Sequence, residues 1–331
     1  MIAAIRMLRP HQWVKNAFVA APLVFAQRLT DKSSVLRTGV AVLAFCLLSG
    51  AVYAFNDVRD VAADRRHPTK CRRPVASGQI SQRAALVISA TLAMVALIGC
   101  WAIRWQLAVF AALYLAQNIA YSMQLKRVAY LDVAVIATGF LLRVLAGAAA
   151  IHVPASKWLL LCTGELAALL ALGKRAHELR WTERIDSPGR AGVRSTPEQG
   201  VRRWIDSPGR AGVRSTPEQG VRRWIDATTA TRAALAGYKL STIRRVLPLL
   251  SAVTCATYVL YTLAPHTVAM FGTRRLVWSA PFVAIGIGRF LALSLWRPKA
   301  EPPTEAMLRD PLIIADVVAA TAIVIYAIYD A

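Results

Sequence analysis

Three aspartates, Asp57, Asp60 and Asp64, follow directly after an apolar run that covers residues 40–55. If the run continues as a helix, the three fall at positions i, i+3 and i+7, and their carboxylates share one face. Like charges this close repel one another, and we expect no side chain of the protein to hold them together. Oxygen ligands of this kind suit Mg²⁺, which is commonly held by one or two carboxylates plus substrate phosphates. The spacing therefore predicts a magnesium and phosphate site at a membrane surface, with a solvated helix end as the plainer alternative.

Other polar residues lie where apolar runs meet basic loops, and Arg143 lies inside such a run. Lysines and arginines at the ends of membrane helices are often only anchors that reach back to the surface. An arginine in the middle of a membrane helix, in contrast, needs an anionic partner. Together these cations would surround the carboxylates in a cavity that suits a diphosphate, whose departure is assisted by charge neutralisation.

Several other kinds of site are not supported. The sequence has no GxxxxGKS phosphate loop, no GxSxG nucleophile elbow and no HExxH zinc helix. Its five cysteines are scattered without a CxxC pair, so neither a disulfide framework nor a zinc site is indicated. The net charge of +22 comes from basic residues clustered between apolar runs. It indicates membrane topology and anionic substrates, with no nucleic-acid partner.

The apolar runs determine the expected architecture. Hydrophobic residues make up 56% of the 331 residues, too many for an ordinary soluble domain. Most of the runs approach the ~20 residues that span a bilayer as a helix. We therefore predict an all-α, polytopic membrane protein with about nine transmembrane helices in one domain over residues 1–331. The segments lie near 14–29, 36–56, 84–103, 105–122, 131–150, 157–173, 243–263, 276–296 and 311–329.

The basic residues are distributed unevenly among the connections between these segments. The N-terminal stretch and the loops after the second, fourth, sixth and eighth segments hold most of the lysines and arginines. By the positive-inside rule, the N-terminus is cytoplasmic and the C-terminus external. We therefore expect a multi-pass protein of the plasma membrane with its active site facing the cytoplasm.

The connection between the sixth and seventh segments contains a perfect duplication. Residues 185–204 recur letter for letter as residues 205–224. Two identical copies rich in Pro, Gly and Arg cannot build a stacked core. We predict that residues 181–228 form a flexible cytoplasmic insert, and binding to a lipid surface or a partner is the alternative.

The stretch NDVRDVAAD (residues 56–64), followed by RRP (72–74), resembles the first aspartate-rich motif of the UbiA superfamily of intramembrane prenyltransferases. The number of segments agrees with that family, and the resemblance spans nearly the whole chain except the duplicated insert. Ordinary members carry a second aspartate-rich motif at the end of the sixth helix, where this chain has GKRAHEL (173–179). That element and RPHQWVKN (9–16) resemble the decaprenyl-phosphate phosphoribosyltransferase branch.

The resemblance implies a UbiA-like bundle that transfers 5-phosphoribosyl from 5-phosphoribosyl 1-diphosphate (PRPP) to a polyprenyl (decaprenyl) phosphate and releases diphosphate. The product would lead to the arabinose donor for cell-wall arabinan. The separate 5-phosphate of PRPP would explain cations in place of the second motif. A lipid phosphate is already ionised, so its attack on the anomeric carbon needs no strong general base. A homo-oligomer is compatible with this assignment.

The implied site combines a metal centre with residues that bind phosphate. Asp57, Asp60 and Asp64 would hold Mg²⁺ and the diphosphate, and Asn56 would orient that group. The implied substrate-binding residues are Lys15, Asn16, Arg59, Lys70, Arg73, Tyr121, Lys126, Arg143, Lys174, Arg175 and Glu178.

Two other functions remain open. An aromatic prenyltransferase of the same fold would use a prenyl diphosphate, and the missing second motif counts against it. A transporter for an anionic metabolite would also use buried cations, but the sequence shows no inverted-repeat halves with broken helices.

Overall fold

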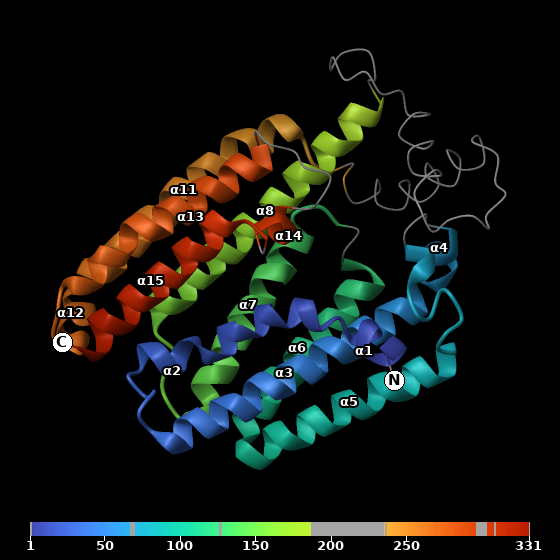
Figure 1. The fold of residues 1–331 in the computed structure, drawn as a ribbon, viewed down its shortest axis with the longest axis horizontal. Helices are drawn as coiled ribbons and strands as arrows, with labels where there is room; N and C mark the ends of the chain where they lie inside the picture. Colours follow the sequence, from blue (N-terminus) through green and yellow to red (C-terminus); the bar gives the residue numbers. More distant parts are fainter. Residues whose placement is uncertain are drawn as a thin grey trace.

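The computed structural model describes residues 2–66, 70–125, 128–186, 235, 237–295, 303–307 and 309–330, and it describes only the backbone of residues 2, 181–186, 304 and 305. All regular elements in these ranges are helices, which confirms the predicted all-α class (Figure 1). The elements are α1 (Ile2–Leu8), η1 (Pro10–Ala20), α2 (Ala21–Phe25), α3 (Lys32–Arg59), α4 (Val61–Arg66), η2 (Lys70–Arg72), α5 (Gln82–Ile103), α6 (Trp105–Met123), α7 (Leu131–Ala150), α8 (Lys157–Asp186), α11 (Leu240–Leu263), α12 (Pro265–Phe271), η4 (Arg275–Ser279), α13 (Ala280–Leu295), α14 (Pro303–Met307) and α15 (Pro311–Tyr329).

Six stretches of the described chain are long and apolar enough to cross a membrane: α3, α5, α7, α11, η4 with α13, and α15. The predicted count of nine is therefore not confirmed. α6 and α8 occupy the fourth and sixth predicted segments but carry polar residues such as Gln117 and Glu165. The first segment is not one α-helix, because the 3₁₀-helix η1 passes into the short α2 beside Pro22. Proline lacks a backbone N–H, so it fits at the start of a helix and not in its interior.

The outer face of α5 is apolar. Val87, Met94, Ile98 and Trp101 are each more than half exposed on it. Large apolar side chains exposed along a whole helix indicate contact with lipid rather than water. Together with the six spanning stretches, this face supports a multi-pass membrane protein.

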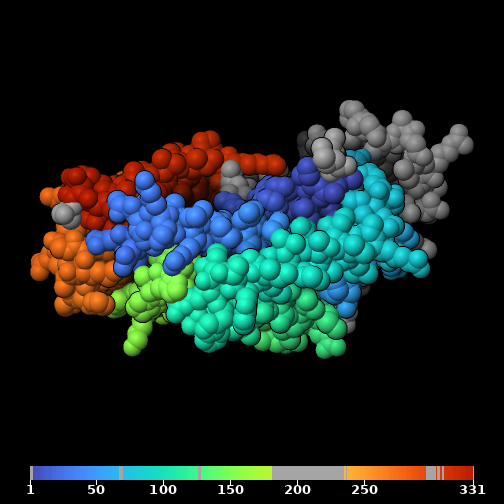
Figure 2. Space-filling model, turned by 90° about the horizontal axis from the view of Figure 1, so that it is seen from below, coloured from blue at the N-terminus to red at the C-terminus, as the bar shows by residue number. Residues whose placement is uncertain are grey.

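The helices form two halves. α3, α5, α6 and α7 make up one half, and α8, α11, α13 and α15 make up the other, with α7 packed against α8 (Figure 1). Figure 2 shows α3 lying along α5 on the face seen from below. A core around Phe45 and Leu48 fills the first half, and a core around Leu169 and Phe290 fills the second.

The segment η1 lies very close to α7. A Cβ atom at Gly147 of α7 would stand 1.9 Å from the carbonyl oxygen of Val19 in η1. Only glycine permits this approach, because any other side chain would overlap the backbone of η1. The contact places Asn16 of η1 in the interior of the bundle, where it is fully buried.

The C-terminal end of α15 is hydrogen-bonded to the N-terminal part of the chain. The Tyr329 hydroxyl accepts a hydrogen bond from the Leu29 N–H at 3.2 Å and donates one to the Val24 carbonyl at 3.2 Å. The Gln27 side-chain amide donates to the Ile328 carbonyl at 3.2 Å. We call these three contacts the Tyr329 clasp.

The duplicated copies lie outside the described residues, apart from the first two residues of the first copy. α8 continues to Asp186 and so takes up residues 181–186 of the predicted insert. Flexibility of the remaining insert stays a prediction.

Candidate active site

The aspartates lie where α3 ends, and the chain turns there instead of continuing as one helix. α3 ends at Arg59 and α4 begins at Val61, with Asp60 between them at φ −93° and ψ 5°. The prediction that the three carboxylates share one continuous helix face is therefore wrong. Asp57 and Asp64 are nevertheless both buried, at 1% and 3% exposed, whereas Asp60 is partly exposed. We call the three residues the aspartate cluster.

Two arginines neutralise the buried aspartates. Arg9 Nη2 lies 2.5 Å from Asp57 Oδ1. Arg73 Nη1 lies 2.7 Å from Asp64 Oδ2 and 3.4 Å from Asp57 Oδ1, so it bridges the two carboxylates. The expectation that no side chain would hold the cluster is wrong, because charges buried this deeply require partners.

Arg9 is a site residue that the sequence prediction missed. Its backbone adopts the left-handed conformation, with φ 51° and ψ 62°, between α1 and η1. Residues with a side chain seldom adopt it, and such strain often occurs at functional sites. The Arg9 guanidinium also lies over the Tyr53 ring, 5.0 Å from its centroid. The available signal was the position of Arg9 in the same short stretch as Lys15 and Asn16.

One oxygen of the aspartate cluster has no hydrogen-bond partner in the described part of the chain. Asp57 Oδ2 is buried and accepts no hydrogen bond from the described residues. Mg²⁺ is commonly held by one or two carboxylates plus substrate phosphates, and Asp57, with Asp60 and Asp64 nearby, fits that donor set. The described residues contain no group of three or more His, Cys, Asp or Glu side chains placed to hold a metal ion. A metal here would therefore depend on the phosphates of a ligand for part of its coordination.

Lys70 of η2 lies beside the cluster. Although much of its side chain is exposed, desolvation and the Arg73 charge lower the pKa of its amine, while the charges of Asp64 and Asp60 act in the opposite direction. The ammonium thus lies close enough to the cluster to contribute to its electrostatics.

Arg143 lies in a second polar group, inside α7. Its Nε donates to Asn16 Oδ1 at 2.9 Å, its Nη1 to the Gly139 carbonyl at 2.9 Å and its Nη2 to the Tyr114 hydroxyl at 2.8 Å. The guanidinium lies 4.6 Å from the centroid of the Tyr114 ring and 5.3 Å from that of Phe140. We call Arg143, Asn16 and Tyr114 the Arg143 cluster.

A polar stripe on α3 joins the Arg143 cluster to the aspartate cluster. Ser49, Tyr53 and Asp57 recur every four residues and so lie on one helix face. The Ser49 hydroxyl lies 3.3 Å from Asn16 Nδ2 and 3.2 Å from the Tyr114 hydroxyl, both in the Arg143 cluster. Tyr53 lies between the clusters, with Arg9 over its ring and Arg143 within electrostatic reach.

Arg175 lies in a third polar group, where it is held by two acids. Its Nε lies 2.6 Å from Asp132 Oδ2, and its Nη1 contacts Glu178 one turn further along α8. The Tyr238 hydroxyl donates to Asp132, and burial raises its pKa. Lys174 is 45% exposed and lies 4.0 Å from Glu178. The predicted residues Lys174, Arg175 and Glu178 thus lie together. Arg175 is paired with the carboxylates of Asp132 and Glu178.

The remaining predicted site residues lie at several places in the bundle. Tyr121 of α6 interacts with the Arg175 side chain. Lys15 donates to a neighbouring glutamine at 2.8 Å. Asn56 is partly buried, and Arg59 is exposed. Lys126 lies outside the described residues.

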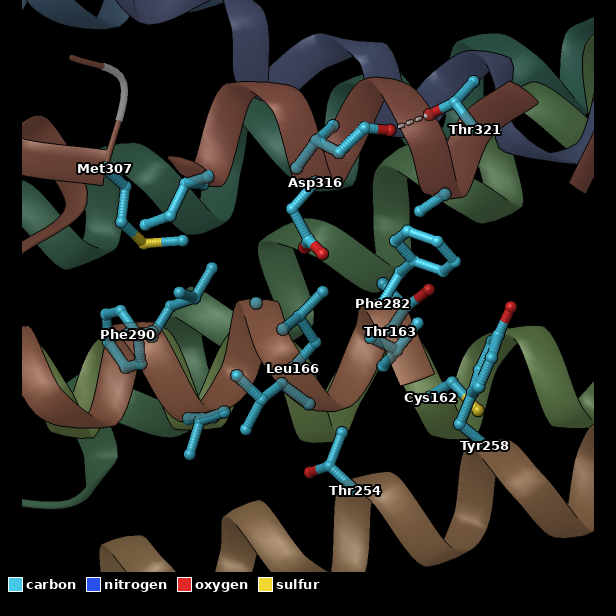
Figure 3. A pocket seen from close by; sticks show the side chains of 18 of the residues that line it. Cys162, Thr163, Leu166, Thr254, Tyr258, Phe282, Phe290, Met307, Asp316 and Thr321 are labelled. Atoms are coloured by element: carbon cyan, nitrogen blue, oxygen red, sulfur yellow. Dashed lines mark hydrogen bonds between the residues drawn. The ribbon is translucent and has the colours of Figure 1, made fainter. Parts of the chain in front are cut away.

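An apolar groove of about 510 Å³ lies between α8, α11, α13 and α15 (Figure 3). Leu166 and Phe290 are among its walls, and Asp316 of α15 points into it. Phe18 of η1 also borders the groove, and its ring packs edge-on against Phe140 with the centroids 4.9 Å apart. Because Phe140 lies beside the Arg143 guanidinium, the Phe18 and Phe140 rings link the groove to the Arg143 cluster.

The sequence is similar to proteins of known family. The family described as "UbiA prenyltransferase family" matches residues 17–198. The chain is 39% identical over 202 residues to a decaprenyl-phosphate phosphoribosyltransferase of Mycolicibacterium smegmatis, and 37% identical over 195 residues to one of Mycobacterium tuberculosis. These matches cover 60% and 58% of this chain, which spans 64% and 65% of the length of the two relatives.

Solved structures share the fold. A UbiA homolog from Archaeoglobus fulgidus bound to GPP and Mg²⁺ has a TM-score of 0.65 to this structure, with 98% of both chains covered and 16% sequence identity. At this identity the likeness shows the fold alone. Because the family match covers more than half of the sequence, the chain belongs to the UbiA prenyltransferase family.

Proposed function

We propose that this protein transfers the 5-phosphoribosyl group of PRPP to a polyprenyl phosphate and releases diphosphate. The proposal depends chiefly on the surroundings of Asp57. One of its oxygens lies beside two arginines, and the other is buried without a hydrogen-bond partner among the described residues. A metal–diphosphate ligand would supply a partner for Asp57 Oδ2. The metal would bind the carboxylate, and the arginines would bind the phosphate oxygens. The names of the relatives supply the transferred phosphoribosyl group and the acceptor class, and PRPP is the donor that we assign.

In the proposed reaction, an oxygen of the lipid phosphate forms a bond to the anomeric carbon while the bond to diphosphate breaks. Diphosphate leaves with the bonding electrons. Mg²⁺, held by Asp57 with Asp60 and Asp64, would neutralise the charge of this leaving group. Arg9 and Arg73 would bind the diphosphate oxygens. The lipid phosphate is already ionised, so the reaction requires no strong base.

The 5-phosphate of PRPP needs a separate cation. Arg175 is already compensated by Asp132 and Glu178, whereas Lys174 is half exposed at the same end of α8. We therefore assign Lys174 to the 5-phosphate and Arg175 to the positioning of α8. Lys15 is a further candidate for binding phosphate.

The polyprenyl chain would occupy the apolar groove, since the groove lies within the membrane-spanning bundle and is linked to the Arg143 cluster through Phe18 and Phe140. The distribution of basic residues supports a cytoplasmic position for the end of α3 in the plasma membrane. PRPP would then enter from the cytoplasm and the lipid from the bilayer. The product would serve the synthesis of cell-wall arabinan.

The test is an assay with purified protein in nanodiscs, PRPP labelled in the ribose, Mg²⁺ and polyprenyl phosphate. Label should enter the lipid fraction only when all components are present, and EDTA should prevent the transfer. Prenylation of an aromatic acceptor from geranyl diphosphate, without transfer from PRPP, would favour the aromatic prenyltransferase. Uptake of unreacted PRPP into proteoliposomes, without transfer, would favour a transporter.

A further inference from the structure

Arg143 is a buried cation without an acidic partner among the described residues. Arg175, equally buried at 7% exposed, contacts Asp132 and Glu178. Arg143, also 7% exposed, contacts only neutral acceptors in the described part of the chain: the Asn16 amide, a backbone carbonyl and the Tyr114 hydroxyl. A guanidinium removed from water without a counter-charge is unfavourable. The arrangement therefore favours binding of an anion next to Arg143.

Arg143 also retains free hydrogen-bonding capacity. A guanidinium carries five N–H donors in a planar fork, and three of those of Arg143 have acceptors in the described part of the chain. The two that remain can serve an anionic oxygen ligand. Arginine is better suited to such a ligand than lysine, because its fork matches the geometry of phosphate.

The Arg143 cluster lies deeper in the bundle than the aspartate cluster. Ser49, which bonds to the Arg143 cluster, precedes Asp57 by eight residues on α3, a distance of about 12 Å along a helix. The Phe140 ring beside the guanidinium packs against Phe18, which borders the apolar groove. The Phe140 and Phe18 rings therefore link the Arg143 guanidinium to a groove suited to an apolar chain.

We propose that Arg143 binds the phosphate of the polyprenyl phosphate acceptor, and that Asn16 and Tyr114 are positioning residues that orient its guanidinium. The identity of the acceptor rests on the proposed function, and its location rests on the geometry. A phosphate monoester on a chain combines one anionic group with an apolar tail. This ligand matches a single uncompensated cation beside an apolar groove.

The order of the two clusters along α3 suits a displacement reaction. The aspartate cluster, with Arg9 and Arg73, is equipped for the more highly charged diphosphate. Tyr53 lies between the clusters on the polar stripe. An acceptor phosphate at Arg143 and a diphosphate at Asp57 would therefore lie on opposite sides of a ribose placed near Tyr53, as attack opposite the leaving group requires.

The test compares the binding of three probes to the protein in nanodiscs: polyprenyl phosphate, the polyprenol of the same length, and PRPP with Mg²⁺. Arg143→Gln should weaken binding of polyprenyl phosphate by about 10- to 100-fold, because a charge-assisted contact is lost. Binding of polyprenol and of PRPP should stay unchanged. Arg143→Lys keeps the charge and should recover part of the loss. Arg83→Gln, which removes an exposed charge at the start of α5, is the matched control and should change none of the three.

Tyr114→Phe tests the positioning role, because it keeps the ring and removes the hydroxyl acceptor of Arg143. A smaller loss confined to polyprenyl phosphate is expected. If a thermal melt shows that Arg143→Gln is not folded, Tyr114→Phe replaces it. The ratio of polyprenyl phosphate binding to polyprenol binding then tests the phosphate assignment.

Two results would overturn the assignment. Weaker PRPP binding with unchanged lipid binding in Arg143→Gln would assign the guanidinium to the donor. Equal losses for polyprenyl phosphate and polyprenol would indicate a structural role. A protein that binds polyprenyl phosphate through Arg143 but never consumes PRPP would refute only the proposed function.

Discussion

Asp57 and Asp60 lie three residues apart in different surroundings. Asp57 is buried and contacts both Arg9 and Arg73, whereas Asp60 is partly exposed at the turn between α3 and α4. Removing one partner of a buried ion pair leaves the other charge uncompensated, at a cost of about 3–5 kcal/mol. Asp57 therefore combines a structural role with ligand binding, and Asp60 gives the cleaner test of metal binding.

Asp60→Asn should reduce turnover by at least about 100-fold, the scale of losing one electrostatic contact to a leaving group. Its unfolding temperature should stay close to that of the parent. Asp57→Asn should lose turnover as well, and it should also unfold at a lower temperature. The measurements are turnover in EDTA-treated, Mg²⁺-restored membranes and thermal unfolding in detergent. Near-normal turnover of either variant would contradict the metal assignment.

Lys174 and Arg175 are neighbours with different partners, so their alanine variants should fail in different ways. Lys174→Ala should raise the KM for PRPP about tenfold, because one charged contact to phosphate is lost. Arg175→Ala removes the guanidinium that lies against the buried Asp132 carboxylate and should destabilise the protein by about 3 kcal/mol. PRPP titrations combined with unfolding measurements distinguish the two. If Lys174→Ala weakened lipid use and left the KM for PRPP unchanged, Lys174 would belong to the acceptor site.

Residue types and spacing predicted several of the residues that the structure brings together. Aspartates directly after an apolar run, and an arginine inside one, are unusual enough to predict a site. The structure places that arginine, Arg143, in contact with the predicted Asn16. Arg9 could not be assigned in this way, because its partner Asp57 lies 48 residues away and is reached through a left-handed turn. Tyr53 looks like an ordinary apolar-helix residue until Arg9 is seen over its ring.

Among the elements, η1 positions part of the site, since it carries Asn16 between α3 and α7. Hydropathy predicted a spanning segment near residues 14–29, and the structure has the 3₁₀-helix η1 followed by α2. A hydropathy pattern reports burial and cannot distinguish an α-helix from a 3₁₀-helix. Pro10 and Pro22 were the local signals that the segment is irregular.

Gly147→Ala tests whether the close approach of η1 is required. The added Cβ would overlap the Val19 carbonyl, so η1 must shift, and we expect a loss of about 1–3 kcal/mol in stability. Binding of polyprenyl phosphate should weaken with it, because Asn16 moves away from Arg143. Gly99→Ala on α5 is the control, since its Cβ meets nothing within 4 Å and alanine favours helix. If Gly147→Ala were as stable and active as Gly99→Ala, the packing of η1 would not position the site.

At the scale of the whole molecule, the two halves of the bundle meet at α7 and α8, and the duplicated stretch begins at the last two residues of α8. The all-α class and the positions of most helices could be predicted, because long apolar runs leave few other structures in a membrane. The predicted number of nine spanning helices is not confirmed, because α6 and α8 carry polar residues, such as Gln117 and Glu165, that bond to neighbouring helices. These residues lower the apolar signal while serving the packing of the bundle.

Deletion of residues 205–224 should leave insertion, folding and turnover close to those of the parent. The deletion joins Trp204 to Ile225, which restores the junction between the copies and removes no apolar segment. Loop-closure entropy changes by only about 0.6 kcal/mol per doubling of loop length. Each copy contains four arginines, one aspartate and one glutamate, so the net charge falls by two and binding to anionic vesicles should weaken slightly. A folded but inactive deletion variant would show that the insert shapes the active site.

The groove and the Tyr329 clasp together bear on how a long lipid could exchange. The clasp connects the end of α15 to the N-terminal segment, while the groove is partly open. A chain lying in a partly open groove can leave sideways, without its tail being threaded through a ring. The volume of the groove, about 510 Å³, is that of a pocket for a small ligand. If a polyprenyl chain lies there, its distal units remain among the bilayer lipids, and exchange kinetics should depend on the headgroup and the first units far more than on total chain length.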